Sequence, residues 1–362
     1  MTDIDTFKPW APRVGVLPSA ARDTICDVAG VTVGHMTLAD GPRQTGITVV
    51  RPDSGDLFLD RVPAASTVIN GFGKSVGLVQ LQELGVIETP IALTNTFSVG
   101  AVSTAQIRQA IARHPEIGRE WATVNPLVME CNDGYLNDIQ ALALGEADYV
   151  RAFDAAADTF AQGSVGAGRG MSCCQLKGGI GSASRVARWD DGLEHTVGVL
   201  VLANFGRLAN LTVAGKQVGG PLAQRLRDLS QPVPTVAPDK GSIILVLATD
   251  APLDTRQLGR LSRRAAAGLA RTGSVYGHGS GDIALAFSTA YRIPYHPRSA
   301  MPDQAMLHES RMDALFEAAA ESVEQSIIHA LWAAETVRGR DGHVRHAVRE
   351  LWPGWAQSLM ND

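Results

Sequence analysis

The sequence predicts a layered α/β fold, in which amphipathic helices cover β-sheets. The chain has 362 residues, 45% of them hydrophobic, and two segments, 195–206 and 243–248, are apolar on both faces as strands inside a sheet are. Segments with apolar residues at helical spacing accompany them. Because buried sheets need helices on their faces, a layered architecture follows. No apolar run reaches the ~18 residues of a membrane-spanning helix, which excludes a transporter or channel.

The first half of the chain is expected to begin with strands and to continue with helices. Between Thr24 and Pro52, short bursts of β-branched residues alternate with Gly, Asp and Pro, which is typical of hairpin strands. Helical spacing then predicts helices at Ser75–Leu84 and Ala101–Arg113, the second ending at His114-Pro115. The apolar run His195–Gly206 predicts a buried central strand.

The second half begins with a proline-rich segment, Asp228–Gly241, which is the best linker candidate in the chain. A second buried strand, Ile243–Ala248, follows it. We then expect a helix at Thr255–Thr272 with Asp254 as its N-cap, and a strand in the run DIALAFSTA. The longest amphipathic helix is expected at Met312–Val337.

Charge and cysteine content exclude several classes of protein. Lys plus Arg number 32 and Asp plus Glu 37, a net charge of −5 without a long run of one sign, so nucleic acid is not expected as a partner. The four cysteines form no C-x-x-C pair and are too few for a disulfide scaffold. The first residues lack the basic and apolar regions of a signal peptide. We therefore expect a cytoplasmic protein with no membrane partner.

Motifs that would bind a cofactor or a metal are incomplete in this chain. The run GSVGAGRGMS, from Gly163, has Met171 where a dinucleotide-binding loop needs glycine, and KGGIGSAS has Ser184 in place of the third glycine. His343 and His346 are expected on a solvated helix, and no H-E-x-x-H motif occurs. A G-x-S-x-G elbow is also missing, which argues against an ordinary α/β-hydrolase. No cofactor and no metal are expected.

The sharpest candidate for chemistry is the junction Gly241-Ser242. The serine opens a buried strand directly after a glycine, where an intramolecular N-to-O acyl shift is feasible. Glycine leaves its own peptide conformationally free, and the rigid strand holds the hydroxyl within reach of the carbonyl. Hydrolysis of the resulting ester would leave Ser242 with a free α-amine of pKa near ~8, which can act as a base. The alternative is that Gly-Ser merely ends a loop.

Two further elements strengthen this hypothesis. Ser280 and Asp282 stand two residues apart at the entrance to an apolar strand, so their side chains share a face and the acid could polarise a relay serine. Asn204 ends a buried strand, where its amide could donate to a developing oxyanion. Taken singly, the first pair is more often a capped hairpin turn and the Asn a turn-forming residue.

With these residues in view, the chain resembles the DmpA/BapA family of self-processing L-aminopeptidase/D-esterases, also called β-peptidyl aminopeptidases. The resemblance extends over roughly Thr24 to Thr289 and rests on segments that occur in family order. These segments are GVTVGH near Val31, TNTFSVGAV from Thr94, ECNDGYLND from Glu130, KGGIGSASR from Lys177, ANFGR from Ala203, KGSIILVLATDAPL from Lys240 and GHGSGDIALAFSTA from Gly277.

This resemblance implies an αββα sandwich, shared with ornithine acetyltransferases and similar to N-terminal-nucleophile hydrolases. It implies that residues 1–362 form a single domain that cleaves itself into an α-chain, 1–241, and a β-chain, 242–362. The two chains would stay associated as αβ pairs, and a homo-oligomer such as a tetramer of pairs is expected. The family needs no cofactor.

The family's residue roles can be carried over to matching positions of this sequence. These expected roles are the nucleophile Ser242, the supporting Ser280 and Asp282, the oxyanion donors Asn204 and Tyr135, the ammonium-binding Glu130, and the cleavage site Gly241-Ser242. Either the Ser242 amine or Ser280 would accept the proton of the nucleophile. Carboxylates are suited to the ammonium role because a charge-assisted hydrogen bond is strong.

Two positions depart from the family pattern. Asp282 stands where some members carry glutamate, and its shorter side chain affects the reach of the relay. Cys131 stands where threonine is expected beside the amine-binding acid, which makes it a candidate for altering substrate preference.

The sequence therefore favours a serine aminopeptidase that removes N-terminal amino-acyl groups from small peptides, amides or esters. The alternative is an amino-acid N-acyltransferase on the same scaffold, although relatives with that activity tend to use threonine where Ser242 stands. A third hypothesis is a non-enzymatic binding protein that kept the fold. The sequence leaves open whether the natural substrate carries an L-, D- or β-amino acid.

Overall fold

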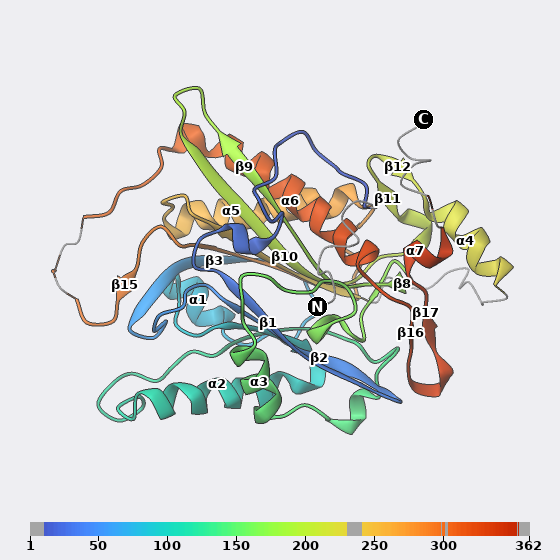
Figure 1. Cartoon of the computed structure of the whole chain (residues 1–362). Helices are drawn as coiled ribbons and strands as arrows, with labels where there is room; N and C mark the ends of the chain where they lie inside the picture. The colour runs from blue at the N-terminus through green and yellow to red at the C-terminus, as the bar shows by residue number, and fades with distance from the viewer. Residues whose placement is uncertain (1–10, 230–240, 298, 301–302, 353, 355–362) are drawn as a thin grey trace.

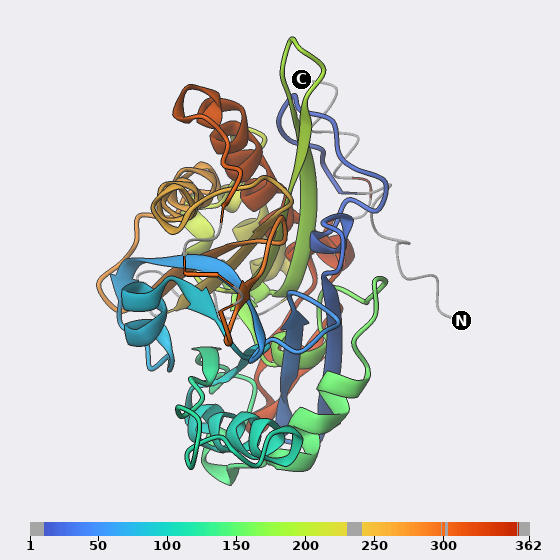
Figure 2. The ribbon, with the colours of Figure 1, turned by 90° about the vertical axis from the view of Figure 1, so that its left-hand side faces the viewer.

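The computed structural model describes residues 11–229, 241–297, 299–300, 303–352 and 354. Its elements are stacked in four layers: two helices, a large sheet, a small sheet and two more helices (Figures 1 and 2). This αββα arrangement is the fold expected from the sequence.

The large sheet holds most of the strands that concern the site. Its β13 and β14 are parallel neighbours, and β14 pairs with β3 and β13 with β10 in antiparallel fashion. The strand order is β15 (Ile293–Pro294), β3 (Asp60–Gly71), β14 (Gly281–Ser288), β13 (Ser242–Thr249), β10 (Glu194–Asn204) and β9 (Gly179–Arg188), with β4 (Val86–Ile87) paired to β3.

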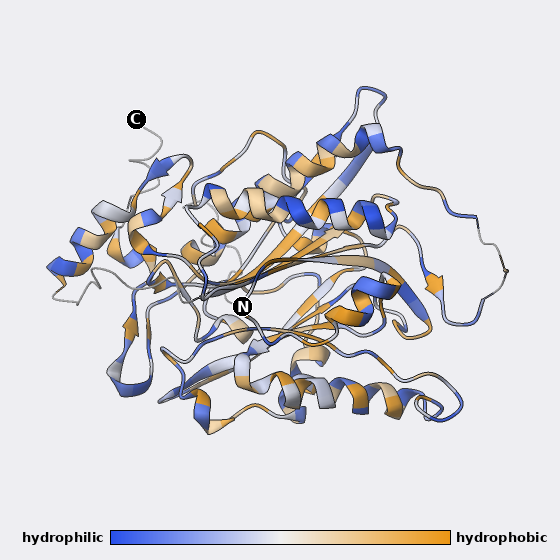
Figure 3. Ribbon diagram, turned by 180° about the vertical axis from the view of Figure 1, so that it is seen from behind, coloured by the Kyte–Doolittle hydropathy of each residue, from blue (hydrophilic) through white to orange (hydrophobic). Residues whose placement is uncertain are grey.

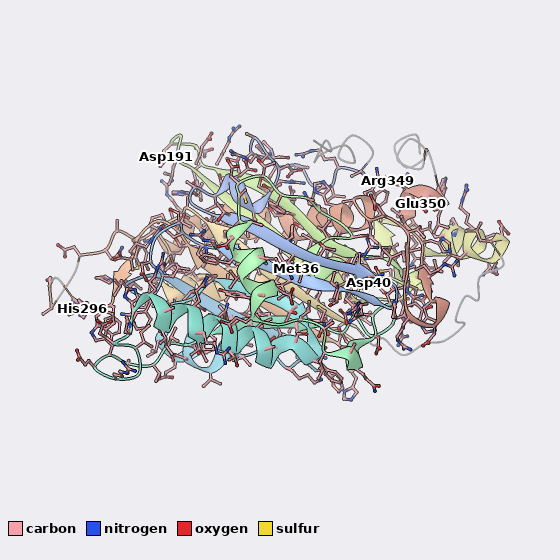
Figure 4. The ribbon with its side chains drawn as sticks, turned by 60° about the horizontal axis from the view of Figure 1, so that its bottom comes forward. Met36, Asp40, Asp191, His296, Arg349 and Glu350 are labelled. Carbon is pink, nitrogen blue, oxygen red and sulfur yellow. The ribbon has the colours of Figure 1, made fainter. Side chains whose placement is uncertain are left out.

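The small sheet packs against one face of the large one. Its strand order is β1 (Thr32–Asp40), β2 (Arg43–Arg51), β5 (Ile91–Asn95) and β6 (Leu127–Cys131). The outer face of the small sheet is covered by α2 (Val99–Arg113) and α3 (Glu146–Asp154), and the outer face of the large sheet by α5 (Thr255–Arg271) and α6 (Met312–Trp332). Figure 4 shows β1, with Met36 and Asp40 labelled, beside α3.

Shorter elements complete the described part of the chain. They are α1 (Leu78–Leu84), α4 (Gly219–Asp228), α7 (Val348–Leu351), β7 (Ser172–Cys173), β8 (Leu176–Lys177), β11 (Thr212–Val213), β12 (Lys216–Gln217), β16 (Val337–Arg338) and β17 (Val344–Arg345), together with short 3₁₀ turns.

The central strand of the large sheet, β13, is apolar on both faces because both faces are buried. Along β13, Ile244 and Val246 pack between the two sheets, whereas Ile243, Leu245 and Leu247 pack with the helices above. Fully burying each such side chain stabilises the fold by about 1.5–3 kcal/mol. In Figure 3 the central strands are accordingly mostly hydrophobic, and hydrophilic residues gather on the outer sides of the helices.

Most of the elements expected from the sequence are confirmed. The hairpin β1–β2, the strands β10, β13 and β14, and the helices α2 and α5 all lie where the periodicity places them. Asp254 caps α5 by accepting from Gln257 N at 2.6 Å, while the Gln257 side chain accepts from Asp254 N. The expected linker at 228–241 falls largely on residues 230–240, which lie outside the described residues.

Two expected helices have different bounds. The first begins at Leu78, because Val76 instead exchanges two backbone hydrogen bonds with Val128. The long C-terminal helix ends at Trp332 and does not reach Val337. After it, the Ser164 hydroxyl binds both the N–H and the carbonyl of Glu335 and draws the chain out of helical geometry.

The expected solvated helix carrying His343 and His346 is wrong. This part of the chain forms the β16–β17 hairpin, which lies near β8 on the right of Figure 1, and His346 O accepts from Lys177 N at 2.8 Å. Among the described residues, no helix is long and apolar enough to cross a membrane.

Candidate active site

The candidate site lies where three neighbouring strands of the large sheet begin or end. Asn204 at the end of β10 pairs with Ser242 at the start of β13, and Ser242 pairs with Gly281 at the start of β14. A cavity of about 1180 Å³ opens beside this row, and its lining includes Ser242, Asn204, Tyr135 and Glu130. The tertiary structure therefore brings together residues that are more than a hundred positions apart.

The Ser242 hydroxyl lies against the carbonyl of the residue before it. Its Oγ donates to Gly241 O at 2.8 Å, and the side chain is buried. The Gly281 N–H faces both groups, 3.1 Å from Gly241 O and 3.3 Å from Ser242 Oγ. A serine hydroxyl is thus held beside a carbonyl whose oxygen already has a backbone donor.

Close backbone packing explains why glycine occupies position 241. A Cβ there would lie 2.4 Å from Asn204 O and 2.7 Å from Phe205 Cα, well inside normal contact. The residue does not adopt a positive φ, so the reason for glycine is space and not the conformational freedom expected from the sequence. Gly281 is similar, because its Cβ would lie 2.7 Å from Phe72 O.

Ser280 and Asp282 share a face, and the Ser280 hydroxyl donates to Asp282 Oδ1. Both residues are about 1% exposed, and they flank the Gly281 that pairs with Ser242. The Asn70 side chain donates to the carbonyl of Gly277 at 3.1 Å and also to that of Ser280, which fixes the turn before β14. A buried acid and hydroxyl therefore lie at the start of β14, the strand beside the one that carries Ser242, and neither of them lines the cavity.

Glu130 is a buried carboxylate at the edge of the cavity. Its Oε1 accepts from Lys74 N at 2.9 Å, and its Oε2 accepts from the Thr96 hydroxyl. The neighbouring Cys131 does not line the cavity; its thiol packs in the core between the sheets and lies 3.5 Å from Leu202 O. Successive strand residues face opposite ways, so Cys131 is turned away from the cavity that Glu130 lines, and its expected effect on substrate preference stays a prediction.

Tyr135 follows β6 and is held by the β16–β17 hairpin. Its ring stacks on His343 at 4.5 Å between centroids, and His343 Nδ1 donates to Tyr135 O at 2.8 Å. The guanidinium of Arg345 lies 3.5 Å from the centroid of the same ring. No sequence pattern predicts these two contacts, because they join segments about 200 residues apart.

The side-chain amide of Asn204 has a defined orientation. Its Oδ1 accepts from Ser172 N at 2.8 Å, and its Nδ2 donates to Asn132 O at 3.0 Å. Because the Ser172 N–H binds Oδ1, the Nδ2 group of Asn204 points the other way, towards Asn132. Both asparagines line the cavity.

Lys177 begins one of the family segments, but the sequence patterns did not predict its structural role. Its Nζ is fully buried and donates to the carbonyls of Gly168, Met171 and Gly178 at 2.9, 2.9 and 2.6 Å. Burial lowers the pKa of Lys177 well below its ordinary value, yet three acceptors match the three protons of an ammonium. This cation fixes the loop that ends in Ser172 and thereby supports the orientation of Asn204.

Within the described residues, no group of three or more His, Cys, Asp or Glu side chains could hold a metal ion. The four cysteines are all buried and free.

Comparison with known proteins identifies the family. The model of Peptidase family S58 matches residues 23–345. The chain belongs to peptidase family S58. The expected resemblance to DmpA/BapA enzymes is confirmed: the chain is 39% identical over 356 residues to the β-peptidyl aminopeptidase BapA of Sphingosinicella microcystinivorans, covering 94% of this chain and 87% of that protein.

Solved structures of relatives confirm the fold. The PH0078 protein of Pyrococcus horikoshii OT3 is 44% identical and superposes with a TM-score of 0.88, over 98% of this chain and 97% of that one. The L-aminopeptidase D-Ala-esterase/amidase of Ochrobactrum anthropi is 34% identical with a TM-score of 0.85, over 97% of both chains, and is described as a variant of the Ntn hydrolase fold. Neither BapA nor the Ochrobactrum enzyme is named as an acyltransferase, so that alternative for this S58 member gains no support.

Proposed function

We propose that this member of family S58 is a self-processing serine aminopeptidase that releases N-terminal amino-acyl groups through an acyl-enzyme on Ser242. One observation carries the proposal: the Ser242 hydroxyl is buried beside the Gly241 carbonyl, between Asn204 on one neighbouring strand and Gly281 on the other.

The first reaction is cleavage of the chain between Gly241 and Ser242. Ser242 Oγ attacks the Gly241 carbonyl carbon, its proton passes to the Ser242 nitrogen, and the C–N bond breaks to leave an ester. The Gly281 N–H, 3.1 Å from Gly241 O, stabilises the oxyanion of this step. Water then hydrolyses the ester to a Gly241 carboxylate and a Ser242 with a free amine and hydroxyl.

The two products, 1–241 and 242–362, would remain one folded unit. In the large sheet, β13 and β14 of the second product lie between β10 and β3 of the first. Separation would therefore break two complete strand pairings and expose the core on both sides of β13. We accordingly regard residues 1–362 as a single domain.

The processed enzyme would then use the same serine on substrates. Glu130 binds the N-terminal ammonium of the substrate, and Ser242 Oγ attacks the adjacent carbonyl carbon. The Ser242 amine, or Ser280 supported by Asp282, accepts the hydroxyl proton and passes it to the leaving amine. Asn204 and Tyr135 donate to the tetrahedral oxygen, and water releases the acyl group.

The substrates we propose are short peptides, amides or esters with a free N-terminal amine, including β-amino-acyl ones because the BapA relative is named a β-peptidyl aminopeptidase. We also propose a homo-oligomer of processed pairs in the cytoplasm. Four buried free thiols are consistent with a reducing compartment.

Denaturing mass spectrometry and an anilide assay test the proposal together. The wild-type protein is expected to give two masses, for 1–241 and 242–362, and to release aniline from at least one L-, D- or β-amino-acyl anilide. Ser242→Ala is expected to give a single uncleaved, inactive chain. Ser54→Ala, which replaces an exposed serine remote from the cavity lining, is the matched control. Normal processing of Ser242→Ala would place the nucleophile elsewhere.

A further inference from the structure

Positive charge predominates around the cavity beside Ser242. Among the described residues that line it, Glu130 is the one carboxylate, whereas Lys74, Arg207, Arg340 and Arg345 carry positive charge. The ammonium of a substrate accounts for Glu130 in the proposed function. The cations have no role in that reaction as written.

Arg345 is held against Tyr135, whereas the neighbouring cation Arg340 is already paired with Asp341. It is partly buried, its Nε donates to Ser172 Oγ at 3.1 Å, and its guanidinium rests on the ring of Tyr135. Within the part of the chain that the structure describes, its recorded contacts include no carboxylate. Burial lowers the pKa of Arg345, so an anionic ligand would offset the cost of holding this charge away from water.

Arg345 and Glu130 lie on opposite sides of the nucleophile. Arg345 contacts Ser172, and the Ser172 N–H binds Asn204 on β10, the strand next to Ser242 on one side. Glu130 lies on the other side, because its Oε1 accepts from Lys74 N just after β3, which pairs with β14. A substrate whose ammonium meets Glu130 therefore extends its leaving portion past Ser242 towards Arg345.

We propose that Arg345 binds the C-terminal carboxylate of the substrate, so that the enzyme prefers short peptides with a free C-terminus over the corresponding peptide amides. The inference rests on the proposed aminopeptidase function and names its substrate class. A guanidinium suits this role because its planar N–H groups match both oxygens of a carboxylate. The Tyr135 ring and Ser172 hold it in place, which reduces the entropy lost on binding.

The test compares a dipeptide and a tripeptide acid with their C-terminal amides, each built on the N-terminal residue that gives the best anilide turnover. In the wild-type enzyme, kcat/KM for the acid of at least one pair is expected to exceed kcat/KM for its amide by about 10-fold or more. This is the size of effect that a hydrogen bond to a charged group typically has, and it should arise mainly from a lower KM for the acid. In Arg345→Gln the acid-to-amide ratio is expected to fall towards one. Because the ratio is taken within one enzyme, any effect of the substitution on Tyr135 cancels.

Arg338→Gln is the matched control, since Arg338 is exposed on the neighbouring strand and does not line the cavity; it should keep the wild-type ratio. Arg345→Lys, which keeps the charge but not the planar fork, should retain a reduced preference for the acid. A wild-type ratio near one for both pairs, or an unchanged ratio in Arg345→Gln, would overturn the inference and leave the aminopeptidase function standing. Failure to hydrolyse any anilide or peptide would overturn both.

Discussion

Substitution of Gly241 by alanine tests whether the geometry around Ser242 drives self-cleavage. The added Cβ would lie 2.4 Å from Asn204 O, whereas ordinary contacts begin at 3.4 Å, an overlap of 1.0 Å (3.4 − 2.4). The opposing atoms belong to the backbone of β10 and its continuation, so no side chain can rotate away to relieve the clash. The Gly241 carbonyl must therefore move relative to Ser242 Oγ.

Two independent estimates give a similar slowing of self-cleavage in Gly241→Ala. Overpacking of a tight site costs about 1–3 kcal/mol, and at ~1.4 kcal/mol per tenfold in rate the upper end corresponds to ~100-fold. A displacement of ~1 Å in a reacting pair also costs about 10²-fold. We expect Gly241→Ala to cleave itself about 100-fold more slowly than the wild-type chain.

The assay follows the uncleaved chain after a short pulse of cell-free synthesis, using intact-protein mass spectrometry to measure products 1–241 and 242–362. Gly220→Ala is the control, because a Cβ at that glycine meets no atom within 4 Å, and it should cleave at the wild-type rate. Circular dichroism of both variants separates slow cleavage from failure to fold. Wild-type cleavage kinetics in Gly241→Ala would refute the argument from backbone proximity.

Three other expected outcomes follow from the site and the core. Asp282→Asn removes the acid that accepts from Ser280 and is expected to lower kcat on an anilide by about 10² or more; an unchanged kcat would exclude it from proton transfer. Glu130→Gln keeps a hydrogen-bonding oxygen but loses the charge, so KM should rise about 10-fold while a smaller change in kcat accompanies it; an unaltered KM would remove Glu130 from ammonium binding. Burial lowers the pKa of His35 from 6.5 to about 4, so the folded state resists protonation and the free energy of unfolding should fall as pH decreases from 6.5 to 4. Urea denaturation across this pH range measures how steeply the free energy of unfolding falls with pH. The fall should be shallower in His35→Gln, and an equal fall in both proteins would contradict the role given to His35.

Much of the fold could be predicted because its elements have strong local signals. The strand that starts at Ser242 is apolar at every position from Ile243 to Ala248, and the α5 helix has a capping box and an apolar stripe. Failures occurred where a distant contact overrides local pattern. Ser164 ends α6 early through Glu335, and the stretch around His343 pairs as a hairpin on Tyr135 although its composition suggested a solvated helix.

The sequence by itself determined the chemistry-bearing residue types and their family: a Gly-Ser junction before an apolar strand, a Ser-x-Asp pair before another, and ordered segments that match peptidase family S58. Only the tertiary structure decided which groups surround them. Strand pairing sets Asn204, Ser242 and Gly281 side by side, and the Lys177 ammonium and the Arg345 guanidinium act there through contacts that no local pattern predicts. The physical reason is that propensity and periodicity act over a few residues, whereas the position of a buried charge depends on partners brought together by the folded core.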